Sequence, residues 1–265
     1  MKKITVSILL FFLSQFGGIA LSVLLFILIA FPQELSVGTI KQLYVEKQSI
    51  INITGMFIGQ VLLFFSLYGL HYFEKQDFRK KITPKTCILT ALLTITALAF
   101  IGGLTAMFGV KDLNHQFFLD IATFPISPIS IIIGAPLTEE LLFRRAMLGS
   151  MVEKGLNPWV AIVTSALLFA VLHLNPAQCV GALGAGLLFG WLYVRTQSIL
   201  PGLIGHFINN LIGYIHILLE SKGVIETSQP QIPIAALAVL AAVTAVLIRM
   251  IMLQSDSCSG KGIKI

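Results

Sequence analysis

The sequence predicts an all-α fold, a polytopic bundle of about eight transmembrane helices with both termini in the cytoplasm. The composition is 56% hydrophobic and only 11% charged, whereas soluble domains carry roughly 25% charged residues. Several apolar runs reach the ~20 residues that a helix needs to cross a bilayer. Lysine and arginine also alternate between rich and poor connecting segments, as the positive-inside rule requires.

Eight apolar runs separated by short polar segments each predict one helix. In chain order they are residues 4–31, 50–72, 87–108, 126–148, 159–173, 177–194, 199–219 and 232–253. The first run follows two lysines, but its apolar length exceeds that of a signal-peptide core, which favours a retained helix. The fifth run is short, and the tight segment LNPAQ follows it.

The positive-inside rule tests this helix count independently. With the N terminus inside, 14 of the 18 basic residues fall in cytoplasmic segments, and the exceptions are Lys41, Lys47, Lys111 and Lys222. We predict one structural domain with three parts. Residues 1–125 hold the first three helices, residues 126–219 form a core with helices four to seven, and residues 220–265 hold the last helix and a short tail.

The net charge of +6 does not predict a nucleic-acid partner, because the basic residues lie between apolar runs without interleaved aromatic residues. Cys87, Cys179 and Cys258 are far apart and lack CxxC spacing, so they predict neither a disulfide framework nor a zinc knuckle. The predicted partner is membrane lipid. The predicted location is a multi-pass position in a membrane, and the compact length favours a bacterial cell membrane.

Ionisable residues inside membrane helices cost about 2.5–3.5 kcal/mol each at the bilayer centre, so they mark functional positions. On the fourth predicted helix, Glu140 and Arg144 are four residues apart and can form a charge pair. Glu139 lies about 100° around the helix and remains available as a general base. The alternative is an interhelical ion network without chemistry.

Two further helices carry isolated polar pairs. His173 shares a helix face with Phe169, and Asn210 shares one with His206. Taken alone, His173 is more often a packed, hydrogen-bonded core histidine, and the alternative for His206 and Asn210 is an interhelical hydrogen bond without chemistry. Combined with the glutamates, they supply a base for water, donors for a developing oxyanion and candidate metal ligands. These groups are what peptide hydrolysis requires.

Three motifs resemble those of one protein family. EELLFR (139–144), FAVLH (169–173) and HFINN (206–210) are similar to the EExxxR, FxxxH and HxxxN/B motifs of the CPBP intramembrane proteases. That family includes CAAX prenyl proteases and bacterial proteins tied to bacteriocin processing and self-immunity. The resemblance covers about residues 125–215. It implies an α-helical membrane endopeptidase with a polar cavity that cleaves near the membrane surface in a lipidated or hydrophobic peptide or protein.

The resemblance also implies a role for each residue. Glu139 would activate the attacking water with help from His173, His206 and Asn210 would stabilise the oxyanion, and Glu140 and Arg144 would hold the geometry. Phe143 and Phe169 are predicted to line the substrate cavity. At 1.5 Å per residue, His173 would lie ~21 Å into its helix and His206 only ~10 Å into its own. A cytoplasm-facing cavity therefore requires different helix boundaries, or tilted or broken helices.

Several alternatives remain open at this stage. His173, His206 and Glu139 could bind Zn²⁺ with an open coordination position, yet the same groups serve as base and donors without a metal. A non-catalytic membrane scaffold or immunity factor would use the same bundle to bind a partner. A proton-coupled transporter would use buried glutamate and histidine as a relay.

Overall fold

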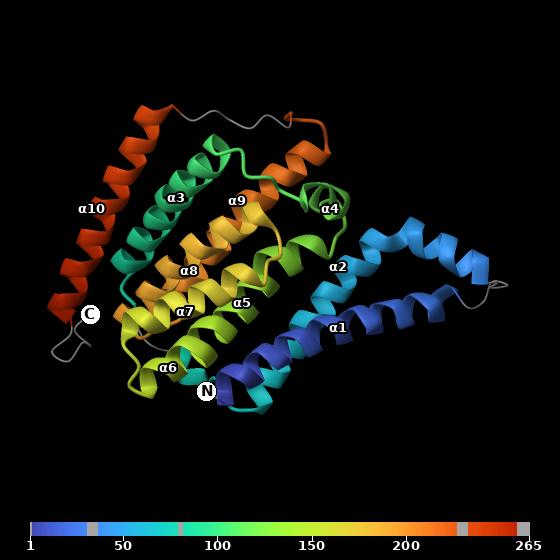
Figure 1. Cartoon of the computed structure of the whole chain (residues 1–265), viewed down its shortest axis with the longest axis horizontal. Coiled ribbons are helices and arrows are strands. Elements are labelled where there is room, and N and C mark those ends of the chain that lie inside the picture. Colours follow the sequence, from blue (N-terminus) through green and yellow to red (C-terminus); the bar gives the residue numbers. More distant parts are fainter. Residues whose placement is uncertain (1, 31–36, 79–81, 227–232, 259–265) are drawn as a thin grey trace.

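The computed structural model describes residues 2–30, 37–78, 82–226 and 233–258, and all regular secondary structure in these ranges is helical (Figure 1). The long helices are α1 (Lys2–Ala30), α2 (Val37–Gly69), α3 (Pro84–Met107), α7 (Pro158–Val171), α8 (Pro176–Thr196), α9 (Leu200–Ser221) and α10 (Ile234–Cys258). The short ones are η1 (Lys75–Phe78) and α4 (His115–Ile121). The predicted all-α class is confirmed.

Within the described ranges, six helices, α1, α2, α3, α8, α9 and α10, are long and apolar enough to cross a membrane. The predicted fifth span is the shorter α7, with 14 residues. Helix α2 begins at Val37, well before the apolar run that predicts it, because the polar residues upstream continue the same helix. Helix α4 does not correspond to an apolar run of spanning length, so hydropathy does not predict it.

The fourth predicted span is one continuous helical rod in which two kinds of turn alternate. It contains η2 (Ile129–Gly134), α5 (Ala135–Glu139), η3 (Glu140–Gly149) and α6 (Ser150–Glu153). The η2 and η3 segments are π-helical, a geometry that is rare and often found at functional sites. The rod contacts α1, α2, α7, α8 and α9, so it occupies the centre of the bundle.

Helices α1 and α2 form a hairpin that projects from the rest of the bundle as an arm (Figure 1). Glycine permits their close approach, since a Cβ at Gly18 would collide with the backbone of Gly55 and Gly59. Such small-residue contacts are typical of packed membrane helices. The Ser22 hydroxyl also donates to the Ile51 carbonyl at 2.8 Å.

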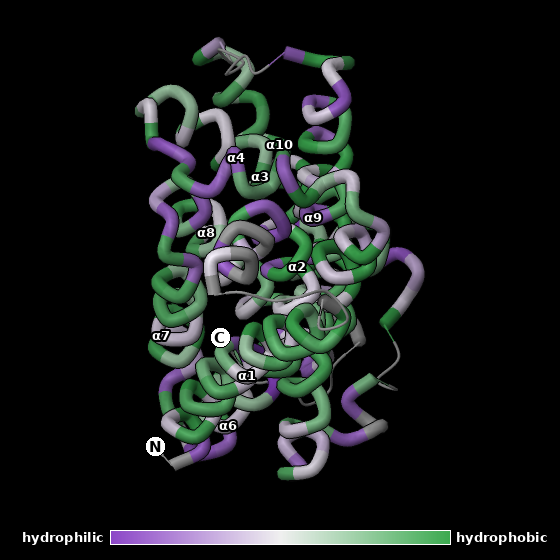
Figure 2. The backbone as a smooth tube through the Cα atoms, turned by 90° about the vertical axis from the view of Figure 1, so that its right-hand side faces the viewer, coloured by the Kyte–Doolittle hydropathy of each residue, from purple (hydrophilic) through white to green (hydrophobic). Residues whose placement is uncertain are grey.

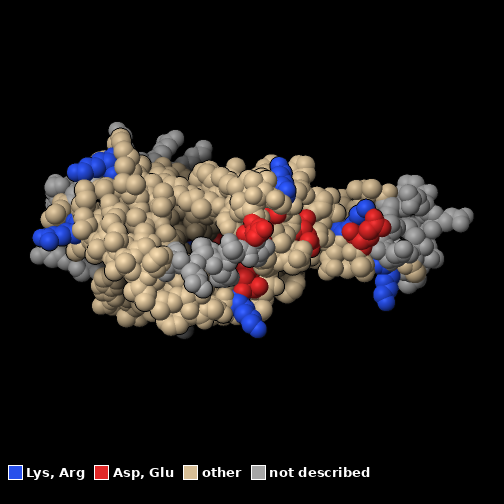
Figure 3. Space-filling model, turned by 90° about the horizontal axis from the view of Figure 1, so that it is seen from above, with Lys and Arg blue, Asp and Glu red and all other residues tan. Residues whose placement is uncertain are grey.

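The outer surface is that of a protein surrounded by lipid. Hydrophobic residues dominate most of the helices, and hydrophilic residues gather mainly toward helix ends and connections (Figure 2). Charged side chains form a few separated patches on an otherwise uncharged surface when the molecule is viewed from above (Figure 3). Large apolar side chains such as Phe16 and Val171 are exposed, as expected where hydrocarbon replaces water.

Segments predicted to lie in the cytoplasm meet at one end of the bundle. The Lys3 ammonium lies 5.5 Å from the centroid of the Tyr72 ring. Arg145 forms ion pairs with Asp77 at 2.9 Å and with Glu153 at 3.0 Å. Arg195 donates a hydrogen bond to the Met252 carbonyl at 3.1 Å. Arg145 therefore ties η3 to the segment after α2. The contacts support the predicted topology, because they join only segments assigned to the same side.

Segments assigned to the opposite side meet at the other end. The Asn175 amide in the α7–α8 turn donates to Asp112 at 2.6 Å and accepts from the Leu113 N–H at 3.1 Å. His115 of α4 pairs with Glu220 near the end of α9 at 2.9 Å. The turn that carries His173 is thus directed away from the end where Arg145 lies.

Candidate active site

A buried ion pair lies at the centre of the bundle. Glu140 and Arg144 are 0% and 1% exposed, and Glu140 Oε2 lies 3.2 Å from Arg144 Nε. Rings of Phe169 and Phe189 cover the guanidinium, with centroids 4.7 and 5.6 Å from its central carbon. The predicted charge pair is present, and each member compensates a charge that would otherwise be buried alone.

His206 connects this pair to Glu139. Its Nδ1 lies 3.0 Å from Glu140 Oε1, and its Nε2 lies 3.5 Å from Glu139 Oε2. Its ring stacks against Phe189 at a centroid distance of 5.8 Å. The result is a continuous chain of four polar side chains, Arg144–Glu140–His206–Glu139, assembled from α5, η3 and α9.

The chain has a defined proton arrangement. A carboxylate paired with arginine accepts hydrogen bonds, so Nδ1 of His206 carries the hydrogen and donates it to Glu140. Nε2 of His206 is then the ring nitrogen that faces Glu139 Oε2. The Glu139 side chain is 22% exposed, against 6% for His206. Glu139 is therefore the open end of the chain.

Gly202 makes room for the Glu140 carboxylate. It lies one turn before His206 on α9, and a Cβ there would collide with Glu140 Oε2. No motif marks this glycine or Phe189, because their importance arises from contacts between helices that are distant in sequence. The Glu140 carboxylate, held by Arg144 and His206, cannot move aside without losing those partners.

We expect Gly202→Ala and Gly213→Ala to change stability in opposite directions. Both lie on α9 and gain about 0.5–1 kcal/mol of helix propensity, but a Cβ at Gly213 meets nothing within 4 Å. Gly213→Ala should raise the unfolding temperature of the detergent-solubilised protein, and Gly202→Ala should lower it by displacing Glu140. Equal shifts in both variants would show that Gly202 is not required for this packing.

His173 lies beside the polar chain Arg144–Glu140–His206–Glu139 and is not a member of it. It lies two residues after the end of α7, and its Nδ1 lies 2.8 Å from the Phe169 carbonyl. A carbonyl only accepts, so Nδ1 is the donor and Nε2 remains available as an acceptor. The Phe169 ring contacts both His173 and His206, at centroid distances of 4.8 and 5.9 Å. The two histidines therefore contact the same phenylalanine ring.

Helix α7 is shorter than a full membrane crossing, close to the short run that predicts it. Its 14 residues span about 21 Å, less than the ~30 Å hydrocarbon layer. The Ser165 hydroxyl donates to the Phe143 carbonyl at 2.9 Å, which aligns α7 with η3. His173 consequently follows a helix that stops short of a full crossing.

Phe143 and Phe169 belong to the hydrophobic core. Both are buried, and their rings pack edge to face at 4.9 Å. Phe169 contacts Arg144 and both histidines, so its observed role is to pack the polar chain. A contact of either ring with substrate stays a prediction.

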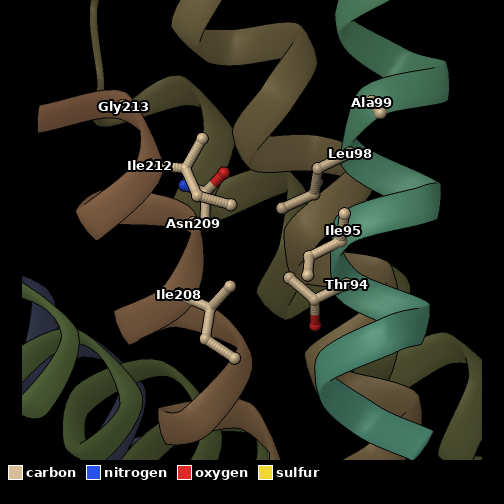
Figure 4. Close-up of a pocket in the computed structure, with 8 residues that line it drawn as sticks. All are labelled: Thr94, Ile95, Leu98, Ala99, Ile208, Asn209, Ile212 and Gly213. Carbon is tan, nitrogen blue, oxygen red and sulfur yellow. The ribbon is translucent and has the colours of Figure 1, made fainter. Parts of the chain in front are cut away.

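The two described cavities lie away from the polar chain. One of about 270 Å³ lies between α3 and α9 (Figure 4), and its lining comprises Thr94, Ile95, Leu98, Ala99, Ile208, Asn209, Ile212 and Gly213. The other, of about 310 Å³, is lined by Gln15, Ile19, Asn52, Met56 and Phe117. Neither is lined by a predicted catalytic residue, so the expected cytoplasm-facing polar cavity stays a prediction.

Asn210 contacts the main chain of η2. Its Nδ2 donates to the Ile131 carbonyl at 2.8 Å, and its Oδ1 accepts from Asn209 Nδ2 at 3.0 Å. Asn209 carries no role in the motifs, yet it lines the cavity between α3 and α9 and contacts Asn210. The structure thus brings Asn210 to the helix that carries the glutamates.

The arrangement does not fit the Zn²⁺ site considered from the sequence. Within the described ranges, no three histidine, cysteine, aspartate or glutamate side chains are grouped so that they could hold a metal ion. Both ring nitrogens of His206 face carboxylates, and His173 directs Nδ1 to the Phe169 carbonyl. A zinc ion on His173, His206 and Glu139 stays a prediction, and no step below depends on it.

The fold and the polar chain together define a polytopic helical membrane protein with a buried carboxylate–histidine centre. Residues 121–212 match the family model of the Rce1-like proteins, described as type II CAAX prenyl endopeptidase Rce1-like. A protein of Bacillus subtilis (strain 168), described as "Putative membrane peptidase YdiL", is 30% identical over 103 residues. That alignment covers 38% of this chain and 42% of the relative. No solved structure matches.

These matches confirm the CPBP resemblance over the segment that contains the three motifs. The segment runs from the end of α4 into α9 and includes all six predicted catalytic residues. The chain is an integral, multi-pass membrane protein, and the B. subtilis relative is consistent with a bacterial origin. The chain spans less than half the length of that relative, and the division into three parts stays a prediction.

Proposed function

We propose that this protein is an intramembrane endopeptidase that hydrolyses a peptide bond in a lipidated or hydrophobic peptide or protein. The observation that carries the proposal is the chain Arg144–Glu140–His206–Glu139. Its inner end is buried and paired, and its outer end is a partly exposed carboxylate. A base held at the end of a pre-arranged network is well suited to activate water.

Glu139 acts as the general base in this proposal. As the water oxygen bonds to the substrate carbonyl carbon, one water proton moves to the Glu139 carboxylate. Nε2 of His206 lies 3.5 Å from Glu139 Oε2, so it takes up that proton from Glu139 and later returns it. When the carbon–nitrogen bond breaks, the proton passes to the departing amine nitrogen, so the chain regains its starting state. His173 assists through Nε2, the ring nitrogen left available by its backbone contact.

Arg144 and Glu140 hold His206 in the required tautomer. The ionised Glu140 accepts from Nδ1, which leaves Nε2 directed at Glu139. Arg144 compensates the charge of the fully buried Glu140 carboxylate. These two residues position His206 and do not touch the substrate.

The substrate class follows from the family resemblance. The matching model describes endopeptidases of CAAX prenyl proteins, which favours a lipidated peptide. Maturation of a leader peptide or bacteriocin and a role in self-immunity are the other assignments that the CPBP resemblance allows.

The test is cleavage by purified protein in liposomes. We would offer a farnesylated CAAX peptide, its unprenylated counterpart and an apolar leader peptide, and identify products by mass spectrometry. Cleavage that is lost in Glu139→Gln and in His173→Ala supports the proposal. A cellular phenotype that survives both substitutions in folded protein would favour the non-catalytic scaffold.

Treatment with a chelator tests whether the activity depends on a bound metal ion. We expect activity to survive prolonged treatment with 1,10-phenanthroline, because no three metal-binding side chains are grouped within the part of the chain that the structure describes. Loss of activity that Zn²⁺ restores, together with stoichiometric zinc in the active protein, would contradict a metal-free reaction.

A further inference from the structure

The π-helical turn at η2 lacks one main-chain donor. The Ala135 N–H donates to the Ser130 carbonyl, five residues earlier. In that register the next donor, residue 136, would serve the Ile131 carbonyl. Residue 136 is proline, which has no N–H, so this position cannot supply a hydrogen bond to Ile131.

Asn210 supplies a donor at that point. Its Nδ2 lies 2.8 Å from the Ile131 carbonyl, across a separation of 79 residues in the sequence. Asn210 is four residues after His206 on α9, and Pro136 is three residues before Glu139. The hydrogen bond therefore joins the turn of α9 that follows His206 to the helical turn that precedes Glu139.

The same turn is held from a second side. The Ser130 hydroxyl donates to Gln60 Oε1 of α2 at 3.0 Å, and a Cβ at Gly134 would collide with that oxygen. Gln60 and Ser130 are both buried. Helices α2 and α9 thus hold η2 from two sides, immediately before the rod reaches the glutamates.

We propose that Asn210 is a positioning residue that replaces the hydrogen bond missing at Pro136 and so holds Glu139 at its distance from His206. This assignment rests on the proposed peptidase function for its catalytic consequence. It differs from the oxyanion role implied by the family resemblance, since the Asn210 amide donates to a main-chain carbonyl and accepts from Asn209.

The test is a double-mutant cycle between positions 136 and 210. Asn210→Ala leaves the Ile131 carbonyl without this donor and should lower both kcat and the folding equilibrium constant by about tenfold, as expected for one buried hydrogen bond. Pro136→Ala restores an N–H that can reach the same carbonyl. The double variant should therefore recover most of both losses.

The rescue separates the two roles of Asn210. A main-chain N–H at position 136 can replace the bond to Ile131 but cannot replace an oxyanion donor. Recovery in the double variant, beyond any gain from Pro136→Ala alone, supports positioning. If kcat stays low in the double variant while its unfolding temperature recovers, Asn210 acts on the oxyanion and the proposal is overturned. Pro136→Gly, measured in parallel, supplies the same N–H should the alanine variant fail to fold.

Thermal unfolding needs no substrate, so the cycle also separates this inference from the proposed function. An inactive wild-type protein that still shows the rescue in unfolding temperature would remove the peptidase proposal and keep the hydrogen-bond assignment. An unfolding temperature that Asn210→Ala leaves unchanged would remove the assignment whatever the activity.

Discussion

Replacing Glu139 with glutamine should lower kcat for peptide hydrolysis by about 10²- to 10⁴-fold, the usual contribution of a general base. Glutamine keeps the size of the side chain and can still hydrogen-bond to Nε2 of His206, but it cannot accept the proton from water. Glu139 is also partly exposed at the end of the polar chain, so the fold should tolerate the change. Single-turnover cleavage and the unfolding temperature, measured on the same preparation, check both statements.

Glu153→Gln is the matched control. Glu153 lies on the same helical rod and pairs with Arg145, but its side chain is 56% exposed and belongs to the opposite end of the rod from η2. Its activity should equal that of the wild type. Hydrolysis by Glu139→Gln at the rate of Glu153→Gln would mean that the base is another residue.

Replacing Arg144 with methionine should lower the free energy of unfolding by about 3–5 kcal/mol, the cost of leaving one member of a buried ion pair without its partner. Methionine fills the space between the Phe169 and Phe189 rings, so the loss reflects charge rather than a cavity. Unfolding of the protein in mixed micelles by increasing denaturant gives the difference. The double variant Glu140→Gln with Arg144→Met should recover part of the loss, because no uncompensated charge then remains.

Arg145→Met is the control for this second prediction. Arg145 is adjacent to Arg144 in the sequence and carries the same guanidinium group. Its side chain, however, is 19% exposed and pairs with Asp77 and Glu153 near the end of the bundle. Partly exposed ion pairs typically contribute no more than about 1 kcal/mol. Equal losses in the two arginine variants would show that burial does not set the strength of the Glu140–Arg144 pair.

Local patterns in the sequence identify most of the helices and one contact of the site. Apolar runs mark the long helices, because a membrane span needs a fixed length of apolar side chains. The Glu140–Arg144 pair follows from its spacing, since residues four apart share a helix face. The extension of α2 to Val37 was not predictable in this way, because polar residues can continue a helix.

Other features of the site have no local signal. The sequence selects Asn210 as an oxyanion donor only through a motif, and the structure places its amide on the Ile131 carbonyl. It selects Phe169 as a cavity residue, and in the structure that ring contacts Arg144 and two histidines. Gly202 and Phe189 carry no motif at all. Each of these positions acquires its role from a neighbour on another helix.

The sequence by itself determined that this protein is a multi-pass helical membrane protein with the CPBP motifs, because hydropathy, charge alternation and motif spacing are local properties of the chain. Only the tertiary structure decided that His206 lies between Glu139 and Glu140 and that Asn210 serves a proline-interrupted π turn. These contacts join residues 66 and 79 positions apart. Their geometry depends on the relative rotation and depth of packed helices, which no single helix encodes.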